Sequence, residues 1–159
     1  MKRQYRYGTF ETASSAIHSL VISKDGLEPS DLPVKKCVLR VPLVPLEREH
    51  VVFSTQLEKL SFIISWVWYY FTYHYNGSAK DEGFENFYML EDITDAIYEY
   101  DSRVFEIKAY KPKDVELSYN HQFYDEISYG DVPYVNIYDK GSIQNFVFNK
   151  YIAVTLGSD

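Results

Sequence analysis

The middle of the chain carries a long hydrophobic pattern that is typical of a buried helix. Residues 60–77 contain no Asp, Glu, Lys or Arg, and apolar side chains would lie on every side of a helix drawn through them. Thr55 and Glu58 have the spacing of a capping box, and Gly77 stands where a glycine commonly ends a helix. We therefore predict a central helix over residues 55–75. A pair of buried strands is the alternative, because Ile, Val, Trp and Tyr also favour strands.

Residues 84–101 show a second helical pattern, with two different faces. When successive residues are turned by 100°, the apolar side chains fall on one side and the acidic side chains on the other. The apolar face consists of Phe87, Leu90, Ile93, Ile97 and Tyr100. The acidic face consists of Glu85, Glu91, Asp92, Asp95 and Glu99. Residues 81–101 hold eight acids and no base, which indicates either a solvated face or a surface that binds a basic partner.

Alternating apolar and polar positions predict strands on both sides of these helices. Before them, strands are predicted at residues 5–10, 20–22 and 34–44. Pro42 and Pro45 end the last of these or place it at a sheet edge. After the helices, strands are predicted at residues 104–110, 115–119, 134–138, 146–148 and 151–154.

Short strands at short intervals are typical of an antiparallel meander. The predicted fold is a single α+β domain over residues 1–159. We expect a mainly antiparallel sheet packed on one buried aromatic helix and one acidic amphipathic helix.

The charge of the chain is negative and unevenly distributed. The 159 residues carry a net charge of −7, and 18% of them are aromatic. Residues 1–50 carry eight basic and six acidic groups, residues 51–110 four and ten, and the remainder four and seven. An acidic middle repels nucleic acid and attracts basic surfaces. We therefore expect no direct binding of nucleic acid, and a protein partner with a basic, nucleic-acid-binding surface.

Cysteine usage and the start of the chain predict a protein of the cytoplasm. Cys37 is the single cysteine, which excludes an internal disulfide and a cysteine-based zinc site. The basic start is followed by no apolar run, so no secretory signal is predicted. Polar residues interrupt residues 60–77, whose last third contains Tyr and His, so no membrane span is predicted either.

Most motifs that indicate catalysis or cofactor binding are absent from the sequence. His18, His50, His74 and His121 share no metal-ligand spacing, and we expect no metal and no cofactor. Glu106 and Lys108 form a Glu-x-Lys pair, which is half of the arrangement of many metal-dependent nucleases. A second acid would be needed, for which the candidates are Asp92, Asp95 and Asp101. The alternative is the exposed face of a strand, on which Glu and Lys commonly alternate.

Hydroxyl and ionisable side chains cluster near the start of the chain. Within nine positions lie Glu11, Thr12, Ser14, Ser15, His18 and Ser19. One hypothesis is a serine nucleophile with His18 as its base. The other is a turn between two strands, in which Thr and Ser side chains satisfy backbone groups.

The same stretch resembles the opening of a group of proteins from Firmicutes phages, prophages and their hosts. That group carries the pattern Phe-Glu-Thr-Asn-Ser-Ser-Ser-x-His-Ser. The positions that match are Phe10, Glu11, Thr12, Ser14, Ser15, His18 and Ser19. Ala13 and Ala16 replace two polar residues of the pattern, which puts a catalytic role of this stretch in doubt. The resemblance implies a small protein of a mobile element that acts by binding host machinery.

These observations lead to one functional hypothesis and two alternatives. The chain is expected to bind and inhibit a host nucleic-acid-handling or defence protein in the host cytoplasm, as small acidic anti-defence proteins, anti-CRISPR proteins among them, do. It is not expected to be an enzyme, and a homodimer is compatible with this role. The first alternative is a self-assembling structural protein of a phage particle, with the aromatic residues at subunit interfaces. The second is the metal-dependent nuclease.

Overall fold

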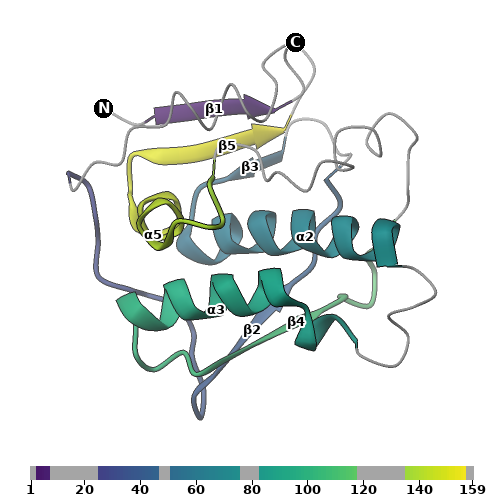
Figure 1. Cartoon of the computed structure of the whole chain (residues 1–159). Coiled ribbons are helices and arrows are strands. Elements are labelled where there is room, and N and C mark those ends of the chain that lie inside the picture. The colour runs from purple at the N-terminus through teal and green to yellow at the C-terminus, as the bar shows by residue number, and fades with distance from the viewer. Residues whose placement is uncertain (1–2, 8–24, 47–50, 76–82, 118–134, 157–159) are drawn as a thin grey trace.

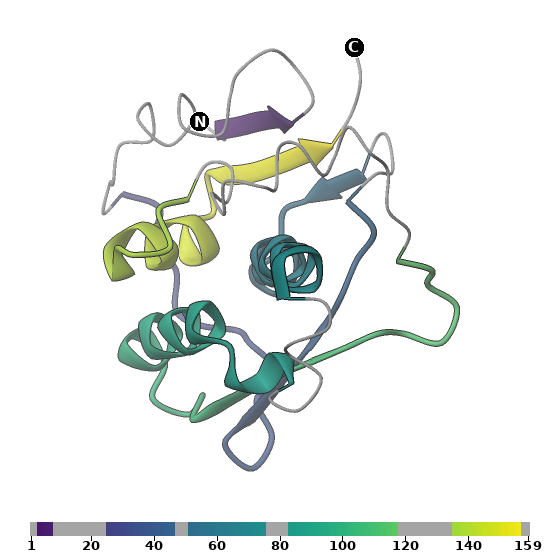
Figure 2. The same ribbon diagram turned by 45° about the vertical axis from the view of Figure 1, so that its right-hand side comes forward.

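One long helix, α2 (Gln56–Tyr75), lies at the centre of the fold. The computed structural model describes residues 3–7, 25–46, 51–75, 83–117 and 135–156. Seen end-on, α2 has the helices α3 (Tyr88–Tyr100) and α5 (Lys140–Phe148) on one side, a three-stranded sheet above and a two-stranded sheet below (Figure 2). Helices and sheets share one hydrophobic core, so the fold is α+β. Among the described residues, no helix combines the length and hydropathy that a membrane span requires.

The central helix begins with the predicted capping box. The Glu58 backbone N–H donates to Thr55 Oγ1 at 3.2 Å, and the Thr55 backbone N–H donates to Glu58 Oε2 at 3.1 Å. The Ser54 N–H donates to the same Oε2 at 2.9 Å. Partial burial of the Glu58 carboxyl opposes its ionisation, but these hydrogen bonds outweigh it and lower the pKa of Glu58. The helix start was therefore predictable from sequence, whereas Gly77 lies outside the described residues.

Burial on every side of α2 confirms the prediction of a central helix and excludes the pair of strands. Seven of its apolar residues are no more than 1% exposed: Leu60, Phe62, Ile63, Ile64, Trp66, Val67 and Tyr69. Phe62 contacts Phe53, Trp66 and Phe146, with ring centroids 5.3 to 6.2 Å apart. Aromatic residues of the central segment thus form the core.

The prediction of a mainly antiparallel sheet is wrong for the described residues. In the upper sheet, β5 (Ile152–Leu156) pairs in parallel with β1 (Arg3–Tyr7) and antiparallel with β3 (Val51–Phe53). In the lower sheet, β2 (Val38–Pro42) pairs in parallel with β4 (Glu106–Tyr110). Helices separate β2 from β4 along the chain, as Figure 1 shows, so neighbouring strands do not pair as a meander.

The predicted strands at residues 134–138 and 146–148 are also wrong. Residues 135–138 contain no strand, and α5 (Lys140–Phe148) occupies most of the following segment. The Asp139 carboxylate accepts hydrogen bonds from the backbone N–H groups of Gly141 and Ser142, at 2.9 and 3.3 Å. It caps the helix. Residues 115–117 contain no strand, and residues 20–22 lie outside the described part of the chain.

The acidic segment forms two helices rather than one. A single 3₁₀ turn, η1 (Phe84–Asn86), precedes α3 (Tyr88–Tyr100), and the extended residue Phe87 separates them. The rings of Phe84 and Phe87 both contact Phe71 of α2, at centroid distances of 5.4 and 5.0 Å. Both rings therefore pack on the central helix, on either side of the break.

Candidate functional site

The orientation of α3 is fixed by its apolar side. Its buried residues are Met89, Leu90, Ile93, Ala96 and Ile97. Phe87 at its start is 7% exposed, and Tyr100 at its end stacks on Phe148 of α5 with ring centroids 3.9 Å apart. The prediction of an apolar face is confirmed. The helix is anchored at both ends, so its outer side is held in one orientation.

The outer side of α3 carries carboxylates and tyrosines together. Glu91, Asp95 and Glu99 are exposed, and Asp92 is half-buried. We call these four residues the acidic face. Tyr88 and Tyr98 fall on the same side of the helix and are 46% and 47% exposed. The structure therefore places four of the five predicted acids on one surface and adds two aromatic side chains that the prediction did not include.

Glu85 lies outside the helix that carries the acidic face. It lies in η1, which the extended residue Phe87 separates from α3. Its carboxylate lies close to Gly83. A Cβ atom added to that glycine would be only 2.7 Å from Glu85 Oε2. The pattern at 100° per residue assumed an unbroken helix, and that assumption fails at Phe87.

The charges of the acidic face lower the stability of the helix that carries them. Glu91, Asp95 and Glu99 are four residues apart, the spacing at which like charges repel along a helix. The last turn of α3 contains no basic residue to balance the partial negative charge of the helix end. Such an arrangement is not explained by helix stability. It is consistent with a surface that meets a basic partner.

The neighbouring helix α5 supports α3 along one side. Lys140 Nζ lies 3.4 Å from Glu99 Oε2, with both side chains more than half exposed, so this ion pair contributes little stability. Gln144 Nε2 donates to the Ala96 carbonyl at 3.0 Å. Sequence reasoning missed these contacts, because it placed strands in the segment that forms α5. Among the described residues, no ion pair involves Glu91, Asp92 or Asp95.

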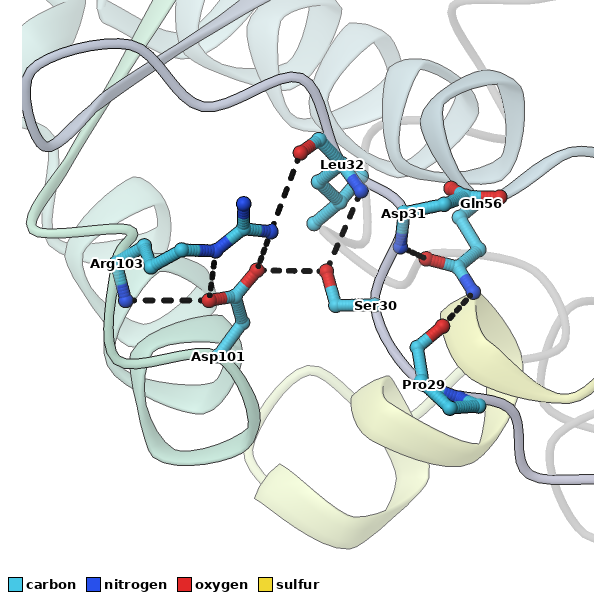
Figure 3. Close-up of polar contacts among 7 residues, drawn as sticks. All are labelled: Pro29, Ser30, Asp31, Leu32, Gln56, Asp101 and Arg103. Carbon is cyan, nitrogen blue, oxygen red and sulfur yellow. Dashed lines mark hydrogen bonds and ion pairs between the residues drawn. The ribbon is translucent and has the colours of Figure 1, made fainter.

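A polar network holds the end of α3 (Figure 3). Asp101 Oδ2 accepts from Ser30 Oγ at 2.6 Å and from Arg103 Nη2 at 2.8 Å, and Oδ1 accepts from Arg103 Nε at 3.0 Å. Arg103 Nη2 also donates to the Leu32 carbonyl at 3.3 Å. The hydrogen bonds from Arg103, assisted by Ser30, overcome the opposing effect of burial and lower the pKa of Asp101 to about 2.

The same segment is tied to the start of α2. Gln56 Nε2 donates to the Pro29 carbonyl and Gln56 Oε1 accepts from the Asp31 N–H, both at 2.9 Å (Figure 3). The Tyr100 hydroxyl donates to the Glu28 carbonyl at 2.6 Å. Burial and the negative charge of Glu28 raise the pKa of Tyr100. Residues 28–32 therefore connect both helices, and Asp101 serves this connection.

The Glu106 and Lys108 pair is not joined to the acids predicted to complete a metal site. Both side chains are more than half exposed on β4, and Lys108 Nζ lies 4.0 Å from Glu106 Oε1. Asp101 is engaged by Ser30 and Arg103, and Asp92 and Asp95 belong to the acidic face of α3. Within the described ranges, no three His, Cys, Asp or Glu side chains are grouped so that they could hold a metal ion.

The cluster near the start of the chain lies outside the described residues. Its members are Phe10, Glu11, Thr12, Ser14, Ser15, His18 and Ser19. The nucleophile and turn hypotheses for this stretch, and its resemblance to phage-associated proteins, stay predictions.

No family model, curated protein or solved structure shows significant similarity to this chain. No function can therefore be carried over from a relative or from the fold. Among the described residues, the acidic face of α3 is the surface that the side chains single out.

Proposed function

We propose that this protein binds and inhibits a nucleic-acid-handling or defence protein of its host cell, through the acidic face of α3. The observation that supports this most is the grouping of four carboxylates with two exposed tyrosines on a helix whose opposite side is buried. The partner is a protein with a basic surface that otherwise holds nucleic acid.

The acidic face would act on such a partner in two ways. Its carboxylates attract Lys and Arg side chains over several ångströms, which speeds association and sets the orientation of the complex. Tyr88 and Tyr98 supply contact area with few rotatable bonds, and aromatic side chains with Arg dominate the binding energy of many interfaces. Because α3 is already ordered, little conformational entropy is lost on binding.

The test is capture of the partner from a nuclease-treated Firmicutes lysate, with tagged protein and washes of increasing salt. We expect one nucleic-acid-handling protein to be retained at low salt and released steeply as salt rises. With that protein purified, the variant Glu91→Gln/Asp92→Asn/Asp95→Asn should associate about ten times more slowly and with a flatter salt dependence.

The matched control removes the same number of charges elsewhere. Asp31, Asp114 and Glu116 are exposed acids outside α3, and Asp31→Asn/Asp114→Asn/Glu116→Gln should bind at nearly the rate of the unmodified protein. Equal slowing of both variants would show that net charge alone drives binding. Unchanged binding of the α3 variant, with its helix content intact by circular dichroism, would remove the acidic face from the mechanism.

A further inference from the structure

The lower sheet presents a second charged surface, of opposite sign. Leu39, Val41 and Ile107 of β2 and β4 are buried, whereas Arg40, Lys108 and Tyr110 are exposed on the outer side. Register pairs Arg40 with Lys108 and Pro42 with Tyr110. We call Arg40, Lys108 and Tyr110 the basic face. Residues 36–42 and 105–111 contain four basic side chains and one acid, Glu106.

Parts of this surface are already ordered for contact. The Arg40 guanidinium carbon lies 4.7 Å from the centre of the Tyr110 ring, and this cation–π attraction favours one position of the side chain. Phe105, which directly precedes β4, is 75% exposed, and its backbone N–H donates to the Cys37 carbonyl at 3.0 Å. Parallel sheets are commonly covered on both sides. One side of this parallel pair is open, and it carries arginine and aromatic residues, which are enriched at protein interfaces.

We propose that the basic face binds the acidic face of a second copy of this chain. The two surfaces have opposite charge, and each combines charged with aromatic side chains. The guanidinium of Arg40 can bind a carboxylate of the acidic face through two parallel hydrogen bonds. Binding then buries part of Tyr88 or Tyr98 against Tyr110. Within the described residues, the acidic face of α3 supplies the complementary surface, so the occupant is a second copy of this chain.

The two surfaces lie on different elements of one chain, which determines the form of the assembly. A single contact between unlike surfaces leaves one acidic and one basic face unused, whereas a two-fold dimer uses all four faces in two reciprocal contacts. Copies therefore assemble either as such a dimer or head to tail into rings or chains. The inference concerns the protein alone and does not depend on the proposed host target.

The test is sedimentation velocity of the purified protein over a range of concentrations. The unmodified protein should form dimers and larger species, and its association constant should fall about tenfold or more between roughly 50 and 500 mM salt. Arg40→Gln/Lys108→Gln and Glu91→Gln/Asp95→Asn should each be monomeric. An equimolar mixture of the two variants should form a one-to-one complex that grows no further, because each variant keeps one intact face.

The control Lys35→Gln/Lys113→Gln removes two exposed lysines outside the basic face and should associate like the unmodified protein. Circular dichroism of every variant shows whether it is folded. A monomeric unmodified protein at low salt would overturn the proposal, as would self-association that persists in the Arg40 and Lys108 variant. A mixture of the two variants that forms no complex would also overturn the proposal. So would a protein whose basic face binds single-stranded RNA and not a second copy.

The proposed function is tested separately, by capture of a host target with the Arg40→Gln/Lys108→Gln variant.

Discussion

At the residue scale, buried polar side chains join segments that are far apart in the sequence. Asp101 shows this most clearly, because the residue is 7% exposed and its carboxylate binds both Ser30 and Arg103. A charged group held this way stabilises the fold only while it is ionised. The Asp-x-Arg spacing gave no sign of this role, since the Ser30 partner lies 71 residues earlier.

Asp101 should therefore make stability depend on acid pH. Folding lowers its pKa from 3.8 to about 2, so its contribution is complete above pH 4 and is lost as the pH falls toward 2. We expect Asp101→Asn to lower the free energy of unfolding by about 1 to 2 kcal/mol at neutral pH, a value reduced because the Arg103 side chain is largely in water. Urea unfolding between pH 2 and 7 should show a flatter profile for this variant. Asp31→Asn, at an exposed position, should keep the profile of the unmodified protein.

Gly26 is a second residue whose role only the structure shows. Its φ angle is +87°, and an added Cβ atom would lie 2.4 Å from both Asn149 Oδ1 and Tyr151 Cδ2. We expect Gly26→Ala to destabilise the fold by about 1 to 3 kcal/mol, because it combines backbone strain with a clash. Gly141→Ala, in the first turn of α5, should be neutral or slightly stabilising. Equal thermal stability of the two variants would show that the Gly26 turn adjusts without cost.

At the element scale, the sequence predicted those helices whose signals are local. The capping box of Thr55 and Glu58 and the apolar run after it specify α2, and the spacing from Leu90 to Ile97 specifies α3. The helix α5 was missed, because Phe146, Val147 and Phe148 also favour strands and become helical through burial against α2 and α3. Strand pairing could not be predicted, since parallel partners such as β2 and β4 are chosen by how the helices pack between them.

The start of α5 depends on Asp139, according to the structure. Its carboxylate accepts from two backbone N–H groups that have no partner within the helix. Asp139→Ala should lower the free energy of unfolding by about 1 kcal/mol, and Asp139→Ser or Asp139→Asn should restore most of it, because both side chains can accept the same bonds. Chemical denaturation measures the difference. Equal stability of the Ala and Asn variants would show that the cap is unimportant.

At the scale of the whole molecule, charge is sorted onto separate surfaces rather than spread evenly. The acidic face lies on α3 and the basic face on the outer side of β2 and β4, with one hydrophobic core beneath both. The sequence predicted the acidic face, since its residues are close together along one helix. It could not predict the basic face, because Arg40 and Lys108 are brought together only by the pairing of β2 with β4.

A surface selected for binding should cost the fold some stability, and Asp95 allows this to be measured. It lies four residues from both Glu91 and Glu99 on α3, so Asp95→Asn removes two repulsive pairs at once. We expect the free energy of unfolding to rise by about 0.4 to 1 kcal/mol at low ionic strength, and the gain to vanish at high salt. The same variant should bind a basic partner more weakly, as measured by sedimentation or by capture. Asp114→Asn, outside α3, should change neither property. A variant that is more stable and binds less well would indicate that the acidic face is retained for recognition, whereas lower stability would assign Asp95 to the fold itself.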